Sequence, residues 1–461
     1  MDQPHLNVPC PHFILKNNGL EVHAGAQHLT LDATQCHLVP DASLILVVAP
    51  AAIEVYSYAL KKRYEIPVQD VMKVHVQGRV VHVLKTPPSV CTLVDNKPVI
   101  TKYPSHYFIL SLAKDRFRLL FSRELRTAPH WPYATVKHTT IAYFTNRVLE
   151  YYAFPEQPAE ELLVPYNEAR ADADELPNVA FVEFSPFSAA LILAAFVPQM
   201  NRFPALVNLY QKTLGAPLEL VNTISFFNAE RCELLWCPTN RFVLALSSID
   251  HDDSHQSYYG ISNLHALYVP DGPPPALPPS LFRSPAHNIF TETLCKIEIQ
   301  HVAFDPTGRL LAVLYDRQPA KLIVFETARM EKVFEKNDVY MNTLLFSPNA
   351  QFLAVGGFGN LPGDIEVYET GTFTRITVFS ANCTTAWRWT PDNTRIVCGQ
   401  CYPRRQVDCQ LQVFTKEGQL ESRLDVVVRE FELFGTPVTK AIPFRVMEVA
   451  DHTELWSASG N

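Results

Sequence analysis

Residues 346–355 of this chain read Phe-Ser-Pro-Asn-Ala-Gln-Phe-Leu-Ala-Val. The phrase consists of an aromatic residue, a small residue, Pro, a few turn-forming residues and then an apolar strand. Pro presets φ for a turn and Asn or Gly completes it, so the phrase predicts a β-hairpin. Five copies occur, and they begin Phe184-Ser185-Pro186, Trp236-Cys237-Pro238, Phe304-Asp305-Pro306, Phe346-Ser347-Pro348 and Trp389-Thr390-Pro391.

The spacing of the copies predicts a repeat architecture. Successive prolines are 52, 68, 42 and 43 residues apart, and a period of about 40–50 residues is typical of arrays of similar units. In three copies a further strand is expected about 20 residues after the proline: Lys321–Thr327, Asp364–Thr370 and Gln410–Thr415. Several short strands per unit at this spacing are typical of the blades of an all-β, WD40-like β-propeller.

The repeats predict one propeller domain over residues 1–461. Clear blades are expected over about 178–430, and weaker strand patterns over about 13–160 extend the count to between seven and nine. Two apolar segments, Val426–Phe434 and Ile442–Val449, remain after the last clear repeat. We expect these C-terminal strands to complete an N-terminal blade, because a propeller protects its sheet edges.

The composition limits the classes of function. With 39 basic and 47 acidic side chains, the net charge of −8 excludes a globally basic nucleic-acid surface. The two basic clusters are Lys61-Lys62-Arg63 and Arg404-Arg405. No apolar run reaches the roughly 18–20 residues that a membrane helix needs. Ten scattered cysteines without an export signal predict reduced thiols and a cytoplasmic location.

Two segments interrupt the repeats. Phe154–Pro177 is acidic and predicts a solvated loop between blades, with a surface helix over Pro158–Leu176 and a partner-binding acidic arm as alternatives. Residues 269–285 are rich in proline and predict an extended, exposed surface loop. An SH3-type ligand at Pro275-x-x-Pro278 is the alternative for this loop.

Three further stretches resemble one known family. The sequence from Gly356 to Tyr368, with its Gly-Phe-Gly-Asn-Leu core, resembles a segment of eukaryotic translation initiation factor 2A. Ser225–Glu230 is similar to that family's Ser-Phe-Phe-Lys-Ala-Asp segment. Ser257-Tyr258-Tyr259-Gly260, followed by Leu264-His265, is similar to its Ser-Tyr-Tyr-Gly…Leu-His segment. The resemblance covers about residues 178–430, and the first 130 residues match only loosely.

The resemblance implies a nine-bladed propeller that engages the small (40S) ribosomal subunit during initiation. It also implies contacts with initiator tRNA and mRNA, which the family links to a Lys-rich helical tail. The sequence ends at Asn461, about where that tail would begin. The resemblance therefore implies binding of the propeller to the small subunit more directly than contacts with tRNA or mRNA. No membrane and no small-molecule substrate are expected.

The glycine-rich stretch Gly357–Gly363 follows a predicted strand. A phosphate-binding loop would have to open a helix and carry a nearby Lys, but here Asp364 follows and a strand is expected. Phe358 either caps the blade or is presented to a partner. The candidate partner-binding residues, taken from this loop, from the resemblance and from the second basic cluster, are Phe358, Gly359, Asn360, Gly363, Tyr258, Tyr259, Arg404 and Arg405.

No catalytic, cofactor-binding or metal-binding residues are predicted. His251 and His255 have a spacing that ligates metal on a helix, but a solvated loop is expected there, with a metal site as the alternative. Cys398 and Cys401, with Cys409 beyond, form a lone CxxC and are expected to be buried thiols; a redox or zinc role is the alternative. Besides the initiation factor, three hypotheses stay open. These are a protein-interaction scaffold, a scaffold propeller like the b subunit of initiation factor 3, and a propeller hydrolase around His251–His255.

Overall fold

The fold was analysed in a computed structural model. The structure describes residues 12–16, 19–24, 27–94, 97–101, 103–113, 116–125, 131–154, 170–200, 202–213, 215–227, 229, 231–249, 261–269, 295–401, 409–425, 429–433 and 442–443. The described residues divide into two compact units. One comprises Met1–Phe227 with Thr384–Thr436, and the other comprises Asn228–Cys383 with Pro437–Asn461.

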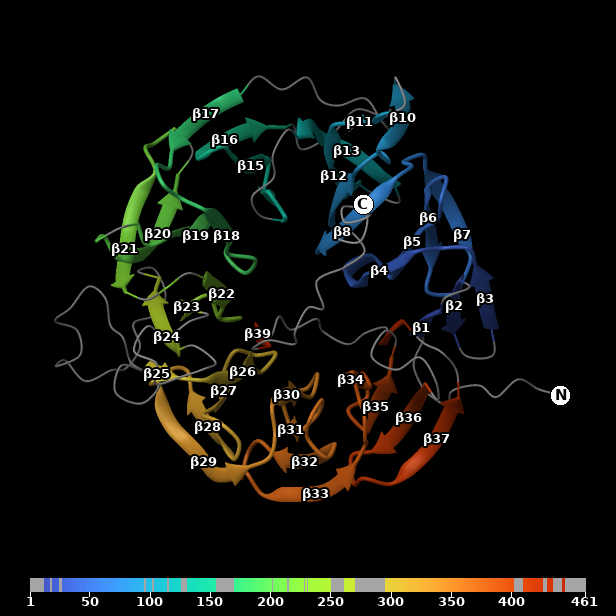
Figure 1. Cartoon of the computed structure of the whole chain (residues 1–461), viewed down its shortest axis with the longest axis vertical. Helices are drawn as coiled ribbons and strands as arrows, with labels where there is room; N and C mark the ends of the chain where they lie inside the picture. The colour runs from blue at the N-terminus through green and yellow to red at the C-terminus, as the bar shows by residue number, and fades with distance from the viewer. Residues whose placement is uncertain are drawn as a thin grey trace. The chain divides into compact units, whose positions relative to one another are not determined.

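The first unit contains six four-stranded antiparallel sheets, whose strands are labelled in Figure 1. In four of these sheets the four strands follow one another directly in the chain. In a fifth sheet two further strands, which form a separate hairpin, are inserted between the second and the third strand. The strands of these five sheets are β4 (Gln35–Val39), β5 (Leu44–Val48), β6 (Ile53–Ser57) and β7 (Lys62–Ile66); β8 (Val71–Gln77), β9 (Val80–Lys85), β12 (Ser105–Ala113) and β13 (Arg116–Leu125); β14 (Ala134–Lys137), β15 (Thr140–Thr145), β16 (Val148–Ala153) and β17 (Arg170–Glu175); β18 (Phe181–Phe184), β19 (Leu191–Val197), β20 (Ala205–Lys212) and β21 (Glu219–Phe226); β34 (Ala386–Trp389), β35 (Arg395–Gln400), β36 (Gln410–Thr415) and β37 (Leu420–Asp425).

The sixth sheet of this unit joins the two ends of the described chain. It consists of β1 (His12–Lys16), β2 (Gly19–Ala24), β3 (Gln27–Leu31) and the late strand β38 (Glu430–Leu433). Strand β38 pairs with β1, with His12 opposite Leu433 and Leu15 opposite Glu430. This confirms the prediction that a C-terminal strand completes an N-terminal blade.

The second unit contains three sheets. They are formed by β22 (Arg231–Trp236), β23 (Phe242–Ile249), β24 (Ile261–Tyr268) and β25 (Cys295–Ile297); β26 (Ile299–Phe304), β27 (Leu310–Tyr315), β28 (Ala320–Glu326) and β29 (Glu331–Val339); β30 (Thr343–Phe346), β31 (Phe352–Gly356), β32 (Asp364–Glu369) and β33 (Arg375–Ser380). A fifth strand, β39 (Ile442–Pro443), pairs with β26 (Figure 1). The second leftover segment therefore does not complete an N-terminal blade.

Nine sheets of this form are the blades of a nine-bladed β-propeller. This number is the one that the family resemblance implies, and it is the upper end of the seven to nine blades expected from the sequence. Each blade places its second and third strands in the most buried position. The second strands β27 and β31, for example, are buried over almost their whole length. The outer fourth strands β29 and β33 are mostly exposed.

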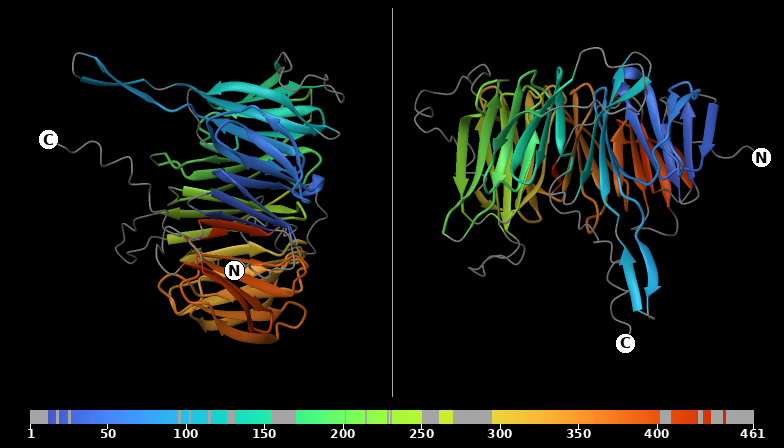
Figure 2. Two further views of the ribbon diagram at one scale, coloured as in Figure 1. Left: turned by 90° about the vertical axis from the view of Figure 1, so that its right-hand side faces the viewer. Right: turned by 90° about the horizontal axis from the view of Figure 1, so that it is seen from above.

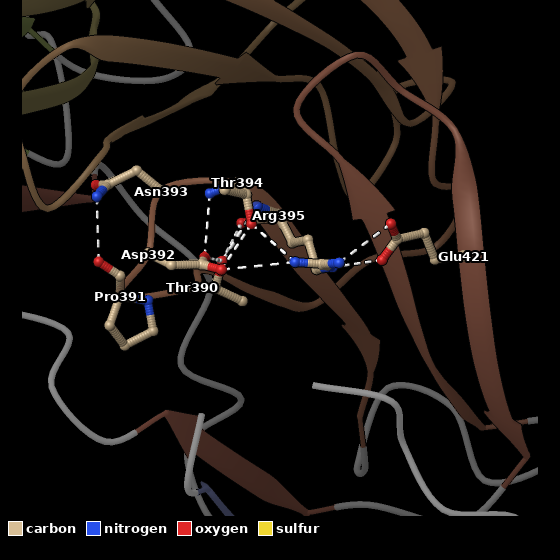
Figure 3. Close-up of polar contacts among 7 residues, drawn as sticks. All are labelled: Thr390, Pro391, Asp392, Asn393, Thr394, Arg395 and Glu421. Carbon is tan, nitrogen blue, oxygen red and sulfur yellow. Dashed lines mark hydrogen bonds and ion pairs between the residues drawn. The ribbon is translucent and has the colours of Figure 1, made fainter. Parts of the chain in front are cut away.

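The turn phrase is held together by hydrogen bonds that explain its composition. In the last copy, Asn393 N donates to Thr390 O at 2.9 Å and closes the turn, and Thr390 N donates to Arg395 O at 2.9 Å. Arg395 N in turn donates to Thr390 Oγ1 at 3.1 Å (Figure 3). The small residue before Pro is therefore a buried cap for the second strand, and Asn393 takes the left-handed conformation at φ 63°.

Two other copies repeat this arrangement. Phe352 N donates to Ser347 Oγ at 2.9 Å, and Leu310 N donates to Asp305 Oδ1 at 3.0 Å. The left-handed positions are Asn240, Gly308, Ala350 and Asn393. The turn that the sequence predicts is confirmed in these four copies, with Ala350 in place of the expected Asn or Gly.

The acidic segment before residue 177 contains a strand. We considered a loop or a helix here, but Arg170–Glu175 is strand β17, paired with β16. The helix prediction is wrong for these residues because pairing with β16 overrides local helix propensity. Asp172 and Asp174 accept hydrogen bonds from the buried Lys212 Nζ at 2.8 and 2.7 Å, so these carboxylates hold two neighbouring blades together. Residues 155–169 of the acidic segment lie outside the described residues.

A two-stranded hairpin is inserted between β9 and β12. Strands β10 (Val90–Val94) and β11 (Lys97–Thr101) pair from Val90 opposite Thr101 to Val94 opposite Lys97. Figure 2 shows this hairpin extending away from the sheet of β8, β9, β12 and β13. This hairpin is not among the elements that we expected from the sequence. In the part of the chain that the structure describes, no helix is long and apolar enough to cross a membrane.

Candidate interaction surface

The glycine-rich loop is a closed connection between the second and third strands of one blade. Strand β31 ends at Gly356 and β32 begins at Asp364. Gly357 N donates to Asp364 O at 2.9 Å, and Gly363 N donates to Gly357 O at 2.8 Å. The chain thus re-enters a strand, so the loop does not open a helix and lacks the geometry of a phosphate-binding loop.

Asn342 fixes the loop from the connection that precedes the same blade. Its side chain pairs with the backbone of Phe358 in both directions: Phe358 N donates to Oδ1 at 3.0 Å, and Nδ2 donates to Phe358 O at 2.9 Å. Asn342 N also donates to Gly356 O at 2.9 Å. Sequence reasoning missed this residue, although an Asn between two predicted strands is a known signal for a side chain that bonds to backbone.

Two glycines of the loop are required by close backbone contacts within the blade. A Cβ at Gly357 would lie 2.2 Å from Tyr340 O. A Cβ at Gly363, which has φ +95°, would lie 2.7 Å from Asn382 Cα. These glycines therefore let the loop fit between the two connections that flank the blade.

The loop presents a small exposed surface. The ring of Phe358 is half-buried and packs over Gly356, where an added Cβ would approach it to 2.8 Å. Gly359 and Asn360 are exposed, and the neighbouring Tyr340 is 58% exposed. Phe358 thus contributes to the blade, as one of our two interpretations expects, and the exposed groups are a tyrosine ring, a backbone segment and an amide.

A group of ionised and polar side chains holds β32 behind the loop. Glu366 accepts hydrogen bonds from Lys336 Nζ at 2.5 Å and from Tyr368 Oη, and Arg375 Nη1 lies 3.4 Å away. Burial by itself would raise the pKa of Glu366, but the hydrogen bonds from Lys336 and Tyr368 outweigh it and hold the pKa below its usual range. The pairing joins β29 to the next blade, so it positions the loop and is not itself an exposed site.

The remaining candidates occupy equivalent connections. Tyr258 and Tyr259 lie between β23 and β24, and Arg404 and Arg405 lie between β35 and β36, all outside the described residues. The stretch His251–His255 and most of the proline-rich loop 269–285 also lie outside them. Every partner-binding candidate therefore falls between the second and third strands of a blade, the position that also carries the inserted hairpin β10–β11.

The cysteines of the CxxC pair are core residues. Cys398, Cys401 and Cys409 are buried and are not joined in disulfides. Burial raises the pKa of Cys398, and it raises the pKa of Cys401 to about 11. Both groups are therefore thiols at neutral pH, which is the first of our two interpretations. Among the described residues, no group of three or more His, Cys, Asp or Glu side chains could hold a metal ion.

Comparisons with known proteins show which family part of the repeat region is similar to. A family model described as eukaryotic translation initiation factor eIF2A matches residues 224–434, which include the glycine-rich loop. Over residues 224–434 the chain is similar to the eIF2A family. The resemblance inferred from Gly356–Tyr368 is thereby confirmed.

Curated relatives match about half of the chain. Eukaryotic translation initiation factor 2A of Saccharomyces cerevisiae is 28% identical over 241 residues, which are 52% of this chain and 35% of the relative. The same factor of Caenorhabditis elegans is 24% identical over 268 residues, 58% of this chain and 44% of the relative. The chain thus spans less than half the length of these relatives. The b subunit of eukaryotic translation initiation factor 3 from Xenopus laevis is 22% identical over 302 residues, 64% of this chain and 39% of the relative.

A solved structure supports the fold. The chain resembles a protein described as "Crystal structure of the eukaryotic initiation factor", with a TM-score of 0.68, 15% identity, and coverage of 93% of this chain and 99% of that one. At this identity the likeness shows the fold alone.

Proposed function

We propose that this protein is a cytoplasmic, non-enzymatic translation initiation factor whose propeller binds the small (40S) ribosomal subunit. The observation that carries the proposal is the eIF2A-family match over residues 224–434. Initiator tRNA and mRNA are further contacts within the same proposal.

The proposed docking edge is the end of the blades where second and third strands connect. In the blade of β30–β33 this edge exposes Tyr340, Gly359 and Asn360 around the half-buried Phe358. Tyr258, Tyr259, Arg404 and Arg405 are proposed to contribute from the same kind of connection, whereas the candidate Gly363 is buried and shapes the loop. A local contact of this kind is needed because the net charge of −8 opposes general attraction to ribosomal RNA.

The test is co-sedimentation of the purified chain with purified small ribosomal subunits across a salt series. We expect the wild type to sediment with the subunits, and the double variant Tyr340→Ala/Asn360→Ala to bind about tenfold more weakly, as expected for loss of a central aromatic contact. The double variant Arg404→Glu/Arg405→Glu should weaken binding most at low salt, because phosphate contacts are screened by salt. Phe187→Ala is the matched control, since Phe187 is 51% exposed and lies between the first and second strands of its blade.

If the wild-type chain stays at the top of the gradient at low salt, the result contradicts the proposal. A protein-interaction scaffold would then take its place. The similarity to the b subunit of initiation factor 3 favours the scaffold form of that alternative. The scaffold alternative predicts that the chain forms a stable complex with the purified components of initiation factor 3 in the absence of ribosomes. Gel filtration would detect this complex.

A further inference from the structure

A groove lies between two neighbouring blades of the second unit, at the end of the strands where the Pro phrases turn. Its volume is about 520 Å³, and residues of both blades line it. One wall is the turn between β26 and β27, with Thr307 and Arg309. The other wall combines the turn between β30 and β31 with the end of β32 and the turn that follows it. The volume lies within the range of about 300–1,000 Å³ that is usual for ligand sites.

Hydrogen bonds fix both walls of the groove. In the first wall, Thr327 Oγ1 donates to Gly308 O at 2.6 Å. In the second wall, Thr370 Oγ1 donates to Ala350 O at 2.7 Å, and Thr370 N donates to Gln351 O at 2.9 Å. The turns are therefore already ordered, and a ligand does not have to order them when it binds.

The two walls carry opposite charges that have no ion-pair partner. Arg309 from one blade and Glu369 from the other line the groove, and both are exposed. Neither forms an ion pair with any of the described residues, and the Glu369 carboxylate accepts one hydrogen bond, from Thr372 Oγ1 at 2.8 Å. Other charged side chains of the same two blades are paired with each other, as in Lys321–Asp316, Lys332–Glu335 and Lys336–Glu366. The groove thus holds one cation and one anion that are not neutralised.

The groove also offers polar groups that match a peptide backbone. Gly371 lines it, and neither its N–H nor its C=O forms a hydrogen bond within the described part of the chain. A Cβ at Gly371 would have nothing within 4 Å, so this backbone segment is accessible. The Gln351 side chain uses its Oε1 to accept from Asn349 Nδ2 at 2.8 Å, which leaves its Nε2 as a donor.

We propose that this groove binds an extended peptide segment in which an acidic and a basic side chain lie close together in sequence. The acidic side chain pairs with the Arg309 guanidinium and the basic one pairs with the Glu369 carboxylate, through charge-assisted hydrogen bonds. The backbone of the segment bonds to Gly371.

Other classes of ligand leave one of the two charges without a partner. A phosphate group would be attracted by Arg309 but repelled by Glu369, and a purely basic segment would be attracted and repelled in the reverse way. An apolar ligand would take both charges out of water without an opposite charge, which is costly.

The groove lies at the end of the strands opposite to the proposed docking edge of the same blades. It is built where first strands pass into second strands and third strands into fourth strands, whereas the docking edge is built where second strands pass into third strands. The peptide site therefore does not depend on the proposed ribosome contact. Arg309→Gln should co-sediment with small ribosomal subunits like the wild type.

The experiment is fluorescence anisotropy of labelled peptides of about six residues, titrated with the full chain. Each peptide contains one Asp and one Lys among glycines, in either order and separated by up to about three glycines. We expect one order and spacing to bind most tightly. Replacing its Asp by Asn, or its Lys by Gln, should weaken binding at least about tenfold, as expected for loss of a charge-assisted bond.

Variants of the chain assign each charge to its partner. Arg309→Gln should weaken binding of the best Asp/Lys peptide by the same factor, and replacing Asp by Asn should then cause no further loss. Glu369→Gln should behave in the same way towards the Lys of the peptide. The exchange Arg309→Glu/Glu369→Arg should reverse the preferred order of Asp and Lys.

A matched control is Arg329→Gln/Glu331→Gln, which removes two exposed charges of the first blade that do not line the groove. This variant should bind the peptides like the wild type. An equal loss in the control would overturn the proposal, and so would a failure of every peptide in the set to bind. Equal binding of the Asp/Lys and Asp/Gln peptides would also overturn it, because the groove would then be a site for an anion alone.

Discussion

The blades of residues 228–383 and the blades of residues 35–175 have the same strand order but different turns. All three later blades carry the Pro phrase, and in two of them Ser347 and Asp305 cap the second strand with their side chains. The early blade of β4–β7 also has a proline, Pro40, and a left-handed residue, Ser43 at φ 52°, but its turn has no side-chain cap. The same four-stranded blade is therefore compatible with turns of different chemistry.

The two regions share a feature of their third strands. A tyrosine donates to a carboxylate two residues earlier, where both side chains lie on one face of the strand. The pairs are Tyr56 with Glu54 on β6, Tyr152 with Glu150 on β16 and Tyr368 with Glu366 on β32. Each carboxylate or tyrosine also contacts a Lys or Arg from the same or the preceding blade. The comparison indicates that alternation and packing of the inner strands determine the blade, whereas the Pro phrase stabilises one turn.

The largest effect is expected from Gly357→Ala in the later blades. The added Cβ would meet Tyr340 O at 2.2 Å, a backbone atom that cannot move by itself. We expect a loss of about 4 kcal/mol or more in the free energy of unfolding, in the range reserved for severe backbone clashes. Urea unfolding followed by tryptophan fluorescence measures it.

Two glycines sharpen this test. Gly78→Ala in the early blades would approach only the Asp41 carboxylate, at 3.1 Å, with φ +59°, and should cost about 1 kcal/mol. Gly371→Ala, with nothing within 4 Å, should change stability by less than about 0.5 kcal/mol. Similar losses at Gly357 and Gly371 would contradict the close packing of the loop.

An intermediate effect is expected from pH, through buried histidines in both regions. His301 is buried and its Nδ1 accepts a hydrogen bond from Leu344 N at 2.6 Å. Burial lowers the pKa of His301 to about 4 and that of His82 to about 3. Because the unfolded chain takes up these protons at a higher pH than the folded chain, stability should fall as pH decreases from about 6.5 towards 4, by up to about 1.4 kcal/mol per pH unit for each group.

Two variants of His301 separate the effect of its protonation on stability from the effect of its hydrogen bond. His301→Asn keeps an acceptor near Nδ1 but does not titrate, so its unfolding free energy should depend less on pH than that of the wild type. His301→Leu leaves Leu344 N without its acceptor and should lose about 1–3 kcal/mol at every pH. Parallel pH profiles of the wild type and His301→Asn would show that His301 is not buried in its neutral form.

The smallest effect is expected from the turn cap. Ser347→Ala removes the acceptor of Phe352 N and should cost about 1 kcal/mol, the usual cost of losing a side-chain cap. Ser43→Ala, at a turn without such a cap, should change the free energy of unfolding by less than half of that value. Chemical denaturation of both variants checks the difference. An equal cost at the two sites would contradict the comparison between the regions.

The tertiary structure decided several features that local sequence signals could not. Residues Arg170–Glu175, which belong to the acidic segment, have the composition of a helix or loop. Pairing with β16 and the ion pairs to Lys212 make them a strand. The hairpin β10–β11 was missed because no Pro phrase precedes it, although Asp95-Asn96 between two runs of apolar residues is a turn signal. Strand β39 pairs with β26, a contact between residues about 140 apart.

The sequence by itself determined the blade repeat, the positions of four of the five turns, the strands that follow them and the similarity of residues 224–434 to the eIF2A family. These features follow from short-range chemistry: Pro fixes φ, Asn or Gly accepts the left-handed conformation, and alternating side chains select a strand. The tertiary structure decided which groups the surface presents. Asn342, Tyr340 and Asn382 constrain the glycine loop, and Tyr64 of one blade contacts Arg116 and Phe117 of the next. Such contacts join residues on different strands, so packing of the blades, and no local pattern, brings them together.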